Sequence, residues 1–182
     1  MRYLVTILVV VSFVVVLPAA AAKHPRVEGD RLEFRFPDLE GNEVSLSDDR
    51  FAGKVVLVDL WGTWCPPCVS EIPTLVEIQE RYRDRGLIIV AIAFEGDDDA
   101  ESRRDYLGGF VEDNGINYLV LDAGPPRDFD AVLPELKNVR GLPIEIFIDR
   151  SGAVVETRNS YGYKKSWVKK LTRDLEALLA ED

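Results

Sequence analysis

Two apolar runs dominate the hydrophobic pattern of this chain, at residues 55–60, where Asp59 is the single polar residue, and at residues 87–94. Runs of this length without polar alternation are typical of strands that are buried on both faces of a sheet. Residues 32–36 and 43–46 instead alternate apolar and polar positions around a Gly-Asn turn, which predicts an edge hairpin. Three further strands are predicted at residues 118–121, 144–148 and 153–157.

Helical periodicity follows the first buried strand, over residues 66–83. At 100° per residue, the apolar positions of this segment span an arc of about 160°. They are Ile72, Leu75, Val76, Ile78 and Tyr82. Cys68 and Glu71 project onto the same arc. Glu71 is therefore predicted to be an acid that points into the interior close to Cys68.

Weaker helical patterns cover residues 100–113, 129–136 and 168–178. The order of the elements is strands alternating with helices, then a hairpin and a last amphipathic helix. This order predicts an α/β sandwich in which helices flank a central mixed β-sheet. An N-terminal β-hairpin precedes this sandwich in the predicted fold.

The first 22 residues differ from the rest of the chain. Arg2 is followed by a nearly unbroken apolar stretch and then by Pro18 and four alanines, which is typical of a cleaved secretory signal peptide. The alternative is an uncleaved anchor, because the stretch is close to the roughly 20 residues that a membrane span needs. Either alternative predicts export. We expect 1–22 to be the leader, 23–29 a spacer and 30–182 one domain.

The chain is acidic, with 22 Lys and Arg against 32 Asp and Glu and a net charge of −10. Such a surface argues against nucleic acid or anionic lipid as a partner. Contact with a membrane is expected only through an uncleaved leader.

The only two cysteines, Cys65 and Cys68, lie between the first buried strand and the helix that follows it. A helix N-terminus stabilises a thiolate and lowers its pKa from about 8.5 towards roughly 7. The spacing lets the two thiols form a disulfide that closes a small ring. The sequence therefore predicts a redox site in which Cys65 attacks a target disulfide and Cys68 resolves the adduct.

Other uses of a cysteine pair fit the sequence less well. A disulfide across four residues removes little loop entropy and would hardly stabilise the fold. A zinc site needs about four ligands, and His24 is far away in the leader region. Covalent haem would need His where Val69 stands. We expect no cofactor and no metal.

Three motifs carry a family resemblance: Val-Asp-Leu-Trp-Gly-Thr-Trp-Cys-Pro-Pro-Cys at 58–68, Glu-Ile-Pro at 71–73 and Gly-Leu-Pro at 141–143. Over residues 34–179 the chain resembles the thioredoxin superfamily, specifically the exported TlpA/ResA/CcmG-like thiol–disulfide oxidoreductases. Residues 97–138 resemble the helix-and-strand insertion of this branch.

The resemblance implies roles for five more residues. Pro143 would be the cis-proline that faces the cysteines, Leu142 would pair its backbone with a bound substrate, and Trp64 would lie at the substrate-binding face. Glu71 resembles the active-site glutamate of ResA-like proteins, and Asp59 resembles the buried acid of thioredoxin. An acid in an apolar setting has a raised pKa and can accept the Cys68 proton near neutrality. Both acids remain candidates.

Proteins of this branch reduce disulfides in partner proteins, such as apocytochrome c or copper-site proteins, with electrons from a membrane thiol carrier. The resemblance implies the same partners here, in the bacterial periplasm or at the outer face of the cytoplasmic membrane. Pro66 and Pro67 offer no N–H to the Cys65 sulfur, which favours a reducing potential nearer about −270 mV than about −120 mV.

Two other functions fit the sequence less well. A peroxidase would need Pro and a hydroxyl residue where Val58 and Gly62 stand. A copper-handling or protein-binding module would use the cysteines as ligands, which a cis-proline packed beside Cys65 would disfavour.

Overall fold

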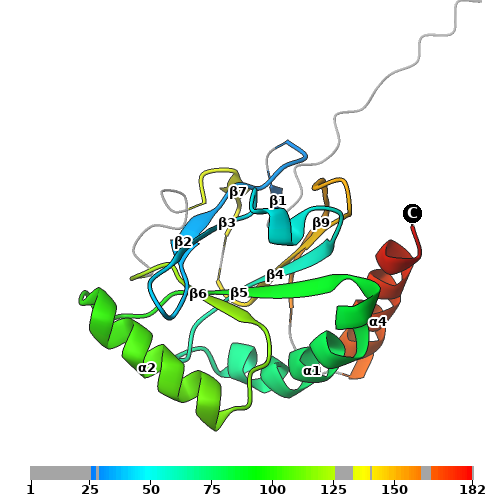
Figure 1. Ribbon diagram of the computed structural model, residues 1–182. Coiled ribbons are helices and arrows are strands. Elements are labelled where there is room, and N and C mark those ends of the chain that lie inside the picture. The colour runs from blue at the N-terminus through cyan, green and yellow to red at the C-terminus, as the bar shows by residue number, and fades with distance from the viewer. Residues whose placement is uncertain (1–25, 28, 126–132, 140, 161–164, 182) are drawn as a thin grey trace, which may run out of the picture.

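A computed structural model describes residues 26–27, 29–125, 133–139, 141–160 and 165–181. Its centre is a five-stranded mixed sheet (Figure 1). In spatial order the strands are β6 (Leu119–Asp122), β5 (Leu87–Ala93), β4 (Val55–Trp61), β8 (Ile144–Ile148) and β9 (Val154–Asn159). The α/β thioredoxin-like fold with a mixed sheet is thereby confirmed.

The two apolar runs form the centre of this sheet. β4 and β5 pair in parallel from Val55 opposite Leu87 to Trp61 opposite Ala93, and every residue of β4 is buried. β8 pairs antiparallel with β4 on its other side, and β9 pairs antiparallel with β8. A strand with neighbours on both sides and layers on both faces contacts no solvent, so it needs no polar alternation.

Three helices are described: α1 (Pro66–Tyr82), α2 (Ala100–Asp113) and α4 (Lys165–Ala180). α1 starts directly after the cysteine loop. It is followed by the short 3-10 helix η2 (Arg83–Arg85), and Gly86 turns the chain at φ +93°. The side chain of Asp99 caps α2 by accepting the Ser102 N–H at 2.8 Å. The observed bounds of α2 are those predicted.

Side chains of successive strand residues alternate between the two faces of the sheet. Val56, Val58 and Leu60 of β4 pack against the N-terminal layer. This layer contains the hairpin β2 (Arg35–Pro37) with β3 (Glu43–Ser45) and the 3-10 helix η1 (Asp49–Phe51). Val55, Leu57 and Trp61 face the helices, and all three described helices lie on that side (Figure 1). Asp59 therefore shares the helix face.

Two expectations need correction. Arg26–Val27, placed in the expected spacer, forms strand β1 and pairs with β7 (Leu136–Lys137), and Val27 is buried in the core. The folded domain therefore begins before residue 30. The predicted helix at 129–136 is wrong at Leu136, which lies in β7, and residues 129–132 fall outside the described ranges.

Among the residues that the structure describes, no helix is long and apolar enough to cross a membrane. The expected leader at 1–22 lies outside the described ranges.

Candidate active site

The two cysteines form a disulfide in the loop between β4 and α1. The S–S distance is 2.07 Å and the Cα atoms are 5.3 Å apart. Cys65 is the N-cap of α1, and Pro66 and Pro67 occupy the first two helical positions. Proline fits there because its missing N–H would have no partner inside the helix. The first N–H of the helix that reaches the Cys65 sulfur is therefore that of Cys68, at 3.4 Å.

Both cysteines are buried in the disulfide form. The attacking role predicted for Cys65 requires an accessible sulfur, but in the disulfide form the exposed fraction of Cys65 is only 5%, against 1% for Cys68. Both residues pack in a core cluster with Trp61 and Ile72. Cys65 remains the more exposed of the two, at the edge of that cluster.

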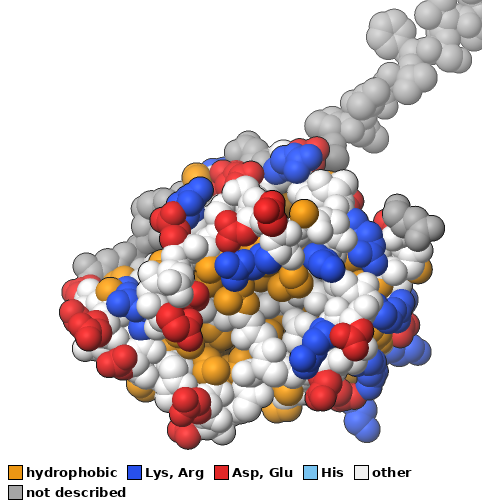
Figure 2. Space-filling view, in the orientation of Figure 1, with side chains coloured by type: hydrophobic (Ala, Val, Ile, Leu, Met, Phe, Trp, Pro, Cys, Tyr) orange, Lys and Arg blue, Asp and Glu red, His pale blue; other side chains and the backbone are white. Residues whose placement is uncertain are grey.

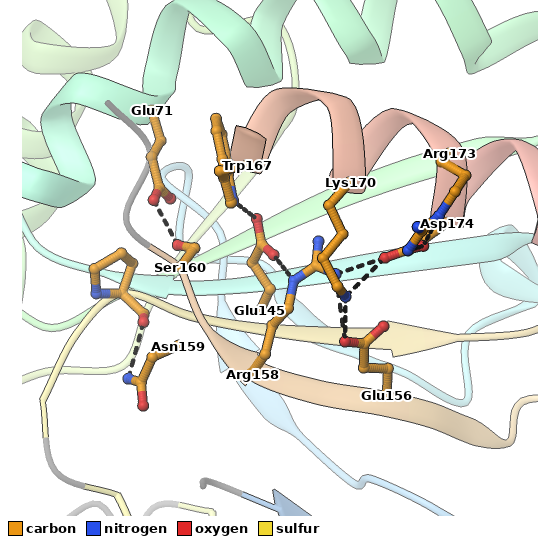
Figure 3. A network of polar contacts seen from close by, with 11 residues as sticks. Glu71, Glu145, Glu156, Arg158, Asn159, Ser160, Trp167, Lys170, Arg173 and Asp174 are labelled. Carbon is orange, nitrogen blue, oxygen red and sulfur yellow. Dashed lines mark hydrogen bonds and ion pairs between the residues drawn. The ribbon is translucent and has the colours of Figure 1, made fainter. Parts of the chain in front are cut away.

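The Leu142–Pro143 peptide bond is cis, the conformation that the resemblance implied. Leu142 packs against the core cluster that contains both cysteines. The backbone around it is held by Asn159, whose side-chain amide donates to the carbonyl oxygens of Gly141 at 3.0 Å and Pro143 at 3.2 Å (Figure 3).

Glu71 is fully buried one turn after Cys68, as predicted. Ser160, which directly follows β9, donates its hydroxyl proton to Glu71 Oε1 at 2.5 Å (Figure 3). The hydrogen bond fixes the carboxyl group of Glu71 on the interior side of α1. An acid is thus held beneath the cysteine loop rather than in solvent.

A row of ionisable residues crosses the sheet beneath α1 and α4. Asp59 of β4 lies directly opposite Glu145 of β8, and Glu145 lies opposite Arg158 of β9. Residues opposite each other in paired strands share a face, with Cβ atoms about 4.5–5.5 Å apart. The antiparallel register therefore places three consecutive ionisable residues side by side on the helix face.

Burial raises the pKa of Asp59 well above its usual value, and the negative charges of Glu71 and Glu145 raise it further. Asp59 Oδ1 has no hydrogen-bond partner among the described residues. Burial also raises the pKa of Tyr118, and the negative charges of Asp59 and Glu71 raise it further. Asp59 therefore holds a proton at pH values where an exposed aspartate has lost it.

Glu145 is the best-satisfied member of the row. Arg158 donates to one of its oxygens at 2.6 Å and the Trp167 indole N–H donates to the other at 2.9 Å (Figure 3). Burial raises the pKa of Glu145, and these two donors oppose that rise. Arg158 also forms an ion pair with Asp174, at 2.7 Å and nearer the surface.

Sequence reasoning missed Glu145 and Ser160. Glu145 had a visible signal, since it is the single charged residue in the apolar segment 144–148. Ser160 had none, because its contact joins residues that are 89 positions apart.

Trp64 directly precedes Cys65 and is exposed. Its indole N–H donates to the Phe94 carbonyl at 2.6 Å. Glu95 accepts the backbone N–H of Thr63 at 2.7 Å and its hydroxyl proton at 3.1 Å. These bonds tie the loop before Cys65 to the end of β5.

Within the described ranges, no group of three or more His, Cys, Asp or Glu side chains is placed to hold a metal ion.

The Redoxin family matches residues 25–175. The chain belongs to this family. Thiol-disulfide oxidoreductase ResA of Bacillus thuringiensis is 33% identical over 124 residues, which cover 68% of this redoxin and 64% of ResA. Thioredoxin-like protein YneN of Bacillus subtilis is 28% identical over 144 residues, 78% of this chain and 76% of YneN.

Solved structures show the same fold. A thiol:disulfide interchange protein of the thioredoxin family from Chlorobium tepidum superimposes with a TM-score of 0.65 at 23% identity, covering 85% of the redoxin and 98% of that chain. A secreted thiol-disulfide isomerase from Corynebacterium glutamicum gives 0.66 at 24% identity, with 91% and 97% covered. The redoxin is thus a thioredoxin-superfamily protein of the TlpA/ResA/CcmG-like group, as the motifs predicted.

The burial of Asp59 has a consequence for stability. Its folded-state pKa is raised, so the stabilising contribution of the bound proton is complete below the unfolded pKa of about 3.9 and is lost as the pH rises through the folded pKa. We expect Asp59→Asn to raise the free energy of unfolding by about 1–3 kcal/mol at pH 8. The gain should shrink towards pH 4.

Urea denaturation of the oxidised protein at pH 4 and pH 8 measures this difference. Asp105→Asn is the control, because Asp105 is exposed on α2. A gain for Asp59→Asn that does not change with pH would contradict a raised pKa of the buried Asp59.

Proposed function

We propose that this redoxin is a thiol–disulfide oxidoreductase that reduces disulfides in partner proteins. The observation that carries the proposal is the Cys65–Cys68 disulfide at the N-terminus of α1, with the buried Glu71 one turn behind it and Asp59 nearby on the sheet. The similarity to thiol-disulfide oxidoreductase ResA supports the same chemistry.

The reduced form would act in two steps. The Cys65 thiolate attacks one sulfur of the partner's disulfide, forming a mixed disulfide and releasing the partner's other sulfur as a thiolate. Cys68 then passes its proton to a carboxylate and attacks the Cys65 sulfur. This attack closes the Cys65–Cys68 disulfide and releases the partner's second thiolate. A dithiol donor afterwards returns two electrons to the redoxin.

Each neighbouring residue supports one part of this cycle. The α1 N-terminus and the Cys68 N–H stabilise the Cys65 thiolate. Glu71 and Asp59 are the candidate acceptors for the Cys68 proton, either directly or through water. The cis-Pro143 segment, with Leu142, would pair with the extended backbone of the partner, and Trp64 would line the docking face.

The location, electron donor and partner proteins are proposed from the family resemblance. We propose that the protein is exported by its N-terminal leader, that a membrane thiol carrier reduces it, and that its partners include apocytochrome c or copper-site proteins.

Trapping tests the exchange itself. Reduced Cys68→Ser should accumulate a covalent adduct with a disulfide-containing protein such as insulin, visible by non-reducing electrophoresis and lost on adding dithiothreitol. The wild type should turn over without accumulating the adduct, and Cys65→Ser should form none. Adducts of equal yield in Cys65→Ser and Cys68→Ser would contradict the assigned roles. A midpoint potential above about −180 mV would contradict the reducing direction.

A further inference from the structure

A cavity of about 660 Å³ opens beside the cysteine loop, beyond the end of β5. The cis-Pro143 segment instead precedes β8, which pairs with the other edge of β4. The walls of the cavity come from three segments: the loop before Cys65, the segment between β5 and α2, and the first two turns of α2. The lining residues are Thr63, Trp64, Glu95, Gly96, Asp97, Ser102, Arg103 and Tyr106. Because Trp64 directly precedes Cys65, the cavity lies beside the segment that carries the attacking cysteine.

Two exposed aromatic side chains line this cavity. Among the described residues, three large hydrophobic side chains are exposed, and two of them are Trp64 at 52% and Tyr106 at 56%. Both have their polar atoms bonded within the protein, Trp64 to the Phe94 carbonyl at 2.6 Å and Tyr106 to the Thr63 hydroxyl at 3.2 Å. What they offer to a ligand is therefore ring surface.

The position of the Trp64 ring is set by close packing. A Cβ atom added to Gly62 would lie 2.5 Å from Trp64 Nε1 and 2.8 Å from the Phe94 carbonyl oxygen. The indole thus lies against the bare backbone of Gly62, and only glycine leaves room for it. The aromatic wall exists before any ligand arrives, so binding orders little additional side chain.

The ionisable groups of the cavity leave an excess of negative charge. The Arg103 guanidinium is bonded to both oxygens of Asp122, at 2.8 and 2.9 Å, and to the Asp97 carbonyl oxygen at 2.7 Å. Arg103 is thus shared between Asp122 and Asp97, and the three carboxylates of Glu95, Asp97 and Asp122 outnumber this single basic side chain of the lining. Acidic side chains are also frequent over α2 in the space-filling view (Figure 2).

We propose that this cavity binds a lysine or arginine side chain of the substrate protein that lies within a few residues of its reactive cysteine. Ring faces attract cations, and the carboxylates of Glu95, which is buried, and Asp97, which is exposed, add to that attraction. An extended chain advances about 3.3–3.6 Å per residue, so a residue one to three positions from the substrate cysteine can reach a site beside Trp64. This inference rests on the proposed disulfide exchange and adds the substrate preference.

Chromogenic peptide disulfides test the preference. A short peptide whose single cysteine carries 5-thio-2-nitrobenzoate reacts with the Cys65 thiolate, and the released nitrobenzoate thiolate is followed by absorbance. Peptides that differ only in Lys, Gln or Glu two residues from the cysteine are compared by their second-order rate constants. We expect Lys to react about tenfold faster than Gln, with Glu slowest, and the preference to weaken with added salt.

Variants separate the cavity from the chemistry. Tyr106→Leu should bring the Lys-to-Gln ratio close to one with the Gln peptide little affected, whereas Tyr106→Phe keeps the ring and should keep the ratio. Asp97→Asn should lower the ratio, and Asp105→Asn, an exposed acid of α2 outside the lining, should not.

The outcomes distinguish the two proposals. Equal rates for Lys and Gln peptides in the wild type, or an unchanged ratio in both Tyr106→Leu and Asp97→Asn, would overturn the cation site while exchange itself stands. Failure of every peptide to react would overturn both.

Discussion

Replacing both buried acids, by Glu71→Gln together with Asp59→Asn, will slow the release of substrate from the mixed disulfide by about a hundredfold to ten-thousandfold at pH 7. Cys68 is 1% exposed, so bulk water and buffer reach its proton poorly. A thiol that keeps its proton is a weak nucleophile. Without a nearby carboxylate, the second step should depend on the small fraction of Cys68 that ionises unaided.

A single-turnover experiment measures this step. The mixed disulfide between Cys65 and a fluorescent thiol is prepared, and the release of that thiol is followed from pH 5 to pH 9. The loss should shrink as the pH rises, because the ionised fraction of Cys68 then grows in the variant. The two single variants show which acid receives the proton, since that variant should carry most of the effect.

The attack of Cys65 on a small disulfide serves as the internal control, because this step needs no proton from Cys68 and should change much less. Glu156→Gln controls for charge, since Glu156 contacts Arg158 at the outer end of the same network (Figure 3). Thiol titration gives an independent measurement. Cys65 and Cys68 pKa values that stay unchanged in both single variants would refute a role for either acid.

Replacing Arg158 by Met will lower the free energy of unfolding by about 3–5 kcal/mol at pH 7, the usual effect of removing one partner of a buried ion pair. Glu145 is fully buried, and Arg158 donates to it at 2.6 Å. The Arg158 guanidinium also lies over the Phe147 ring, 4.4 Å from its centroid. Its loss leaves the Glu145 carboxylate with Trp167 as its remaining donor.

The loss should be smaller at pH 4, because protonation of Glu145 removes the unpaired charge. Exchanging both members of the pair for apolar residues, Glu145→Leu with Arg158→Met, should recover much of the stability. The matched control is Arg35→Met, which breaks the exposed pair with Glu43 and should cost at most about 1 kcal/mol. Urea denaturation compares these variants. Equal losses for Arg35→Met and Arg158→Met would show that Glu145 needs no partner.

Local patterns were sufficient to predict most of the elements. The apolar runs became β4 and β5, and the pattern at 100–113 became α2 with Asp99 as its cap. The angular position of Glu71 on a helix predicted its burial, because a helix of known phase has a known inward face. In each case the information lies within about one turn or one strand.

Pairings between distant segments were not visible in the sequence. β1 and β7 are each two residues long and lie about 110 positions apart. Neither is long enough to show the alternation of apolar and polar residues that indicates a strand. The contact of Glu71 with Ser160 and the cavity between Trp64 and Tyr106 also depend on how separate elements pack. The low exposure of Cys65 also depends on the core residues that pack around it.

Neighbouring residues alone identify the family, most of the elements and the dithiol with an acid one turn behind it, because each of these lies within one short segment of the sequence. The tertiary structure alone decided that Asp59, Glu145 and Arg158 form one row. That row depends on the register of β4, β8 and β9. A shift of one residue in any pairing would turn its side chains to the other face.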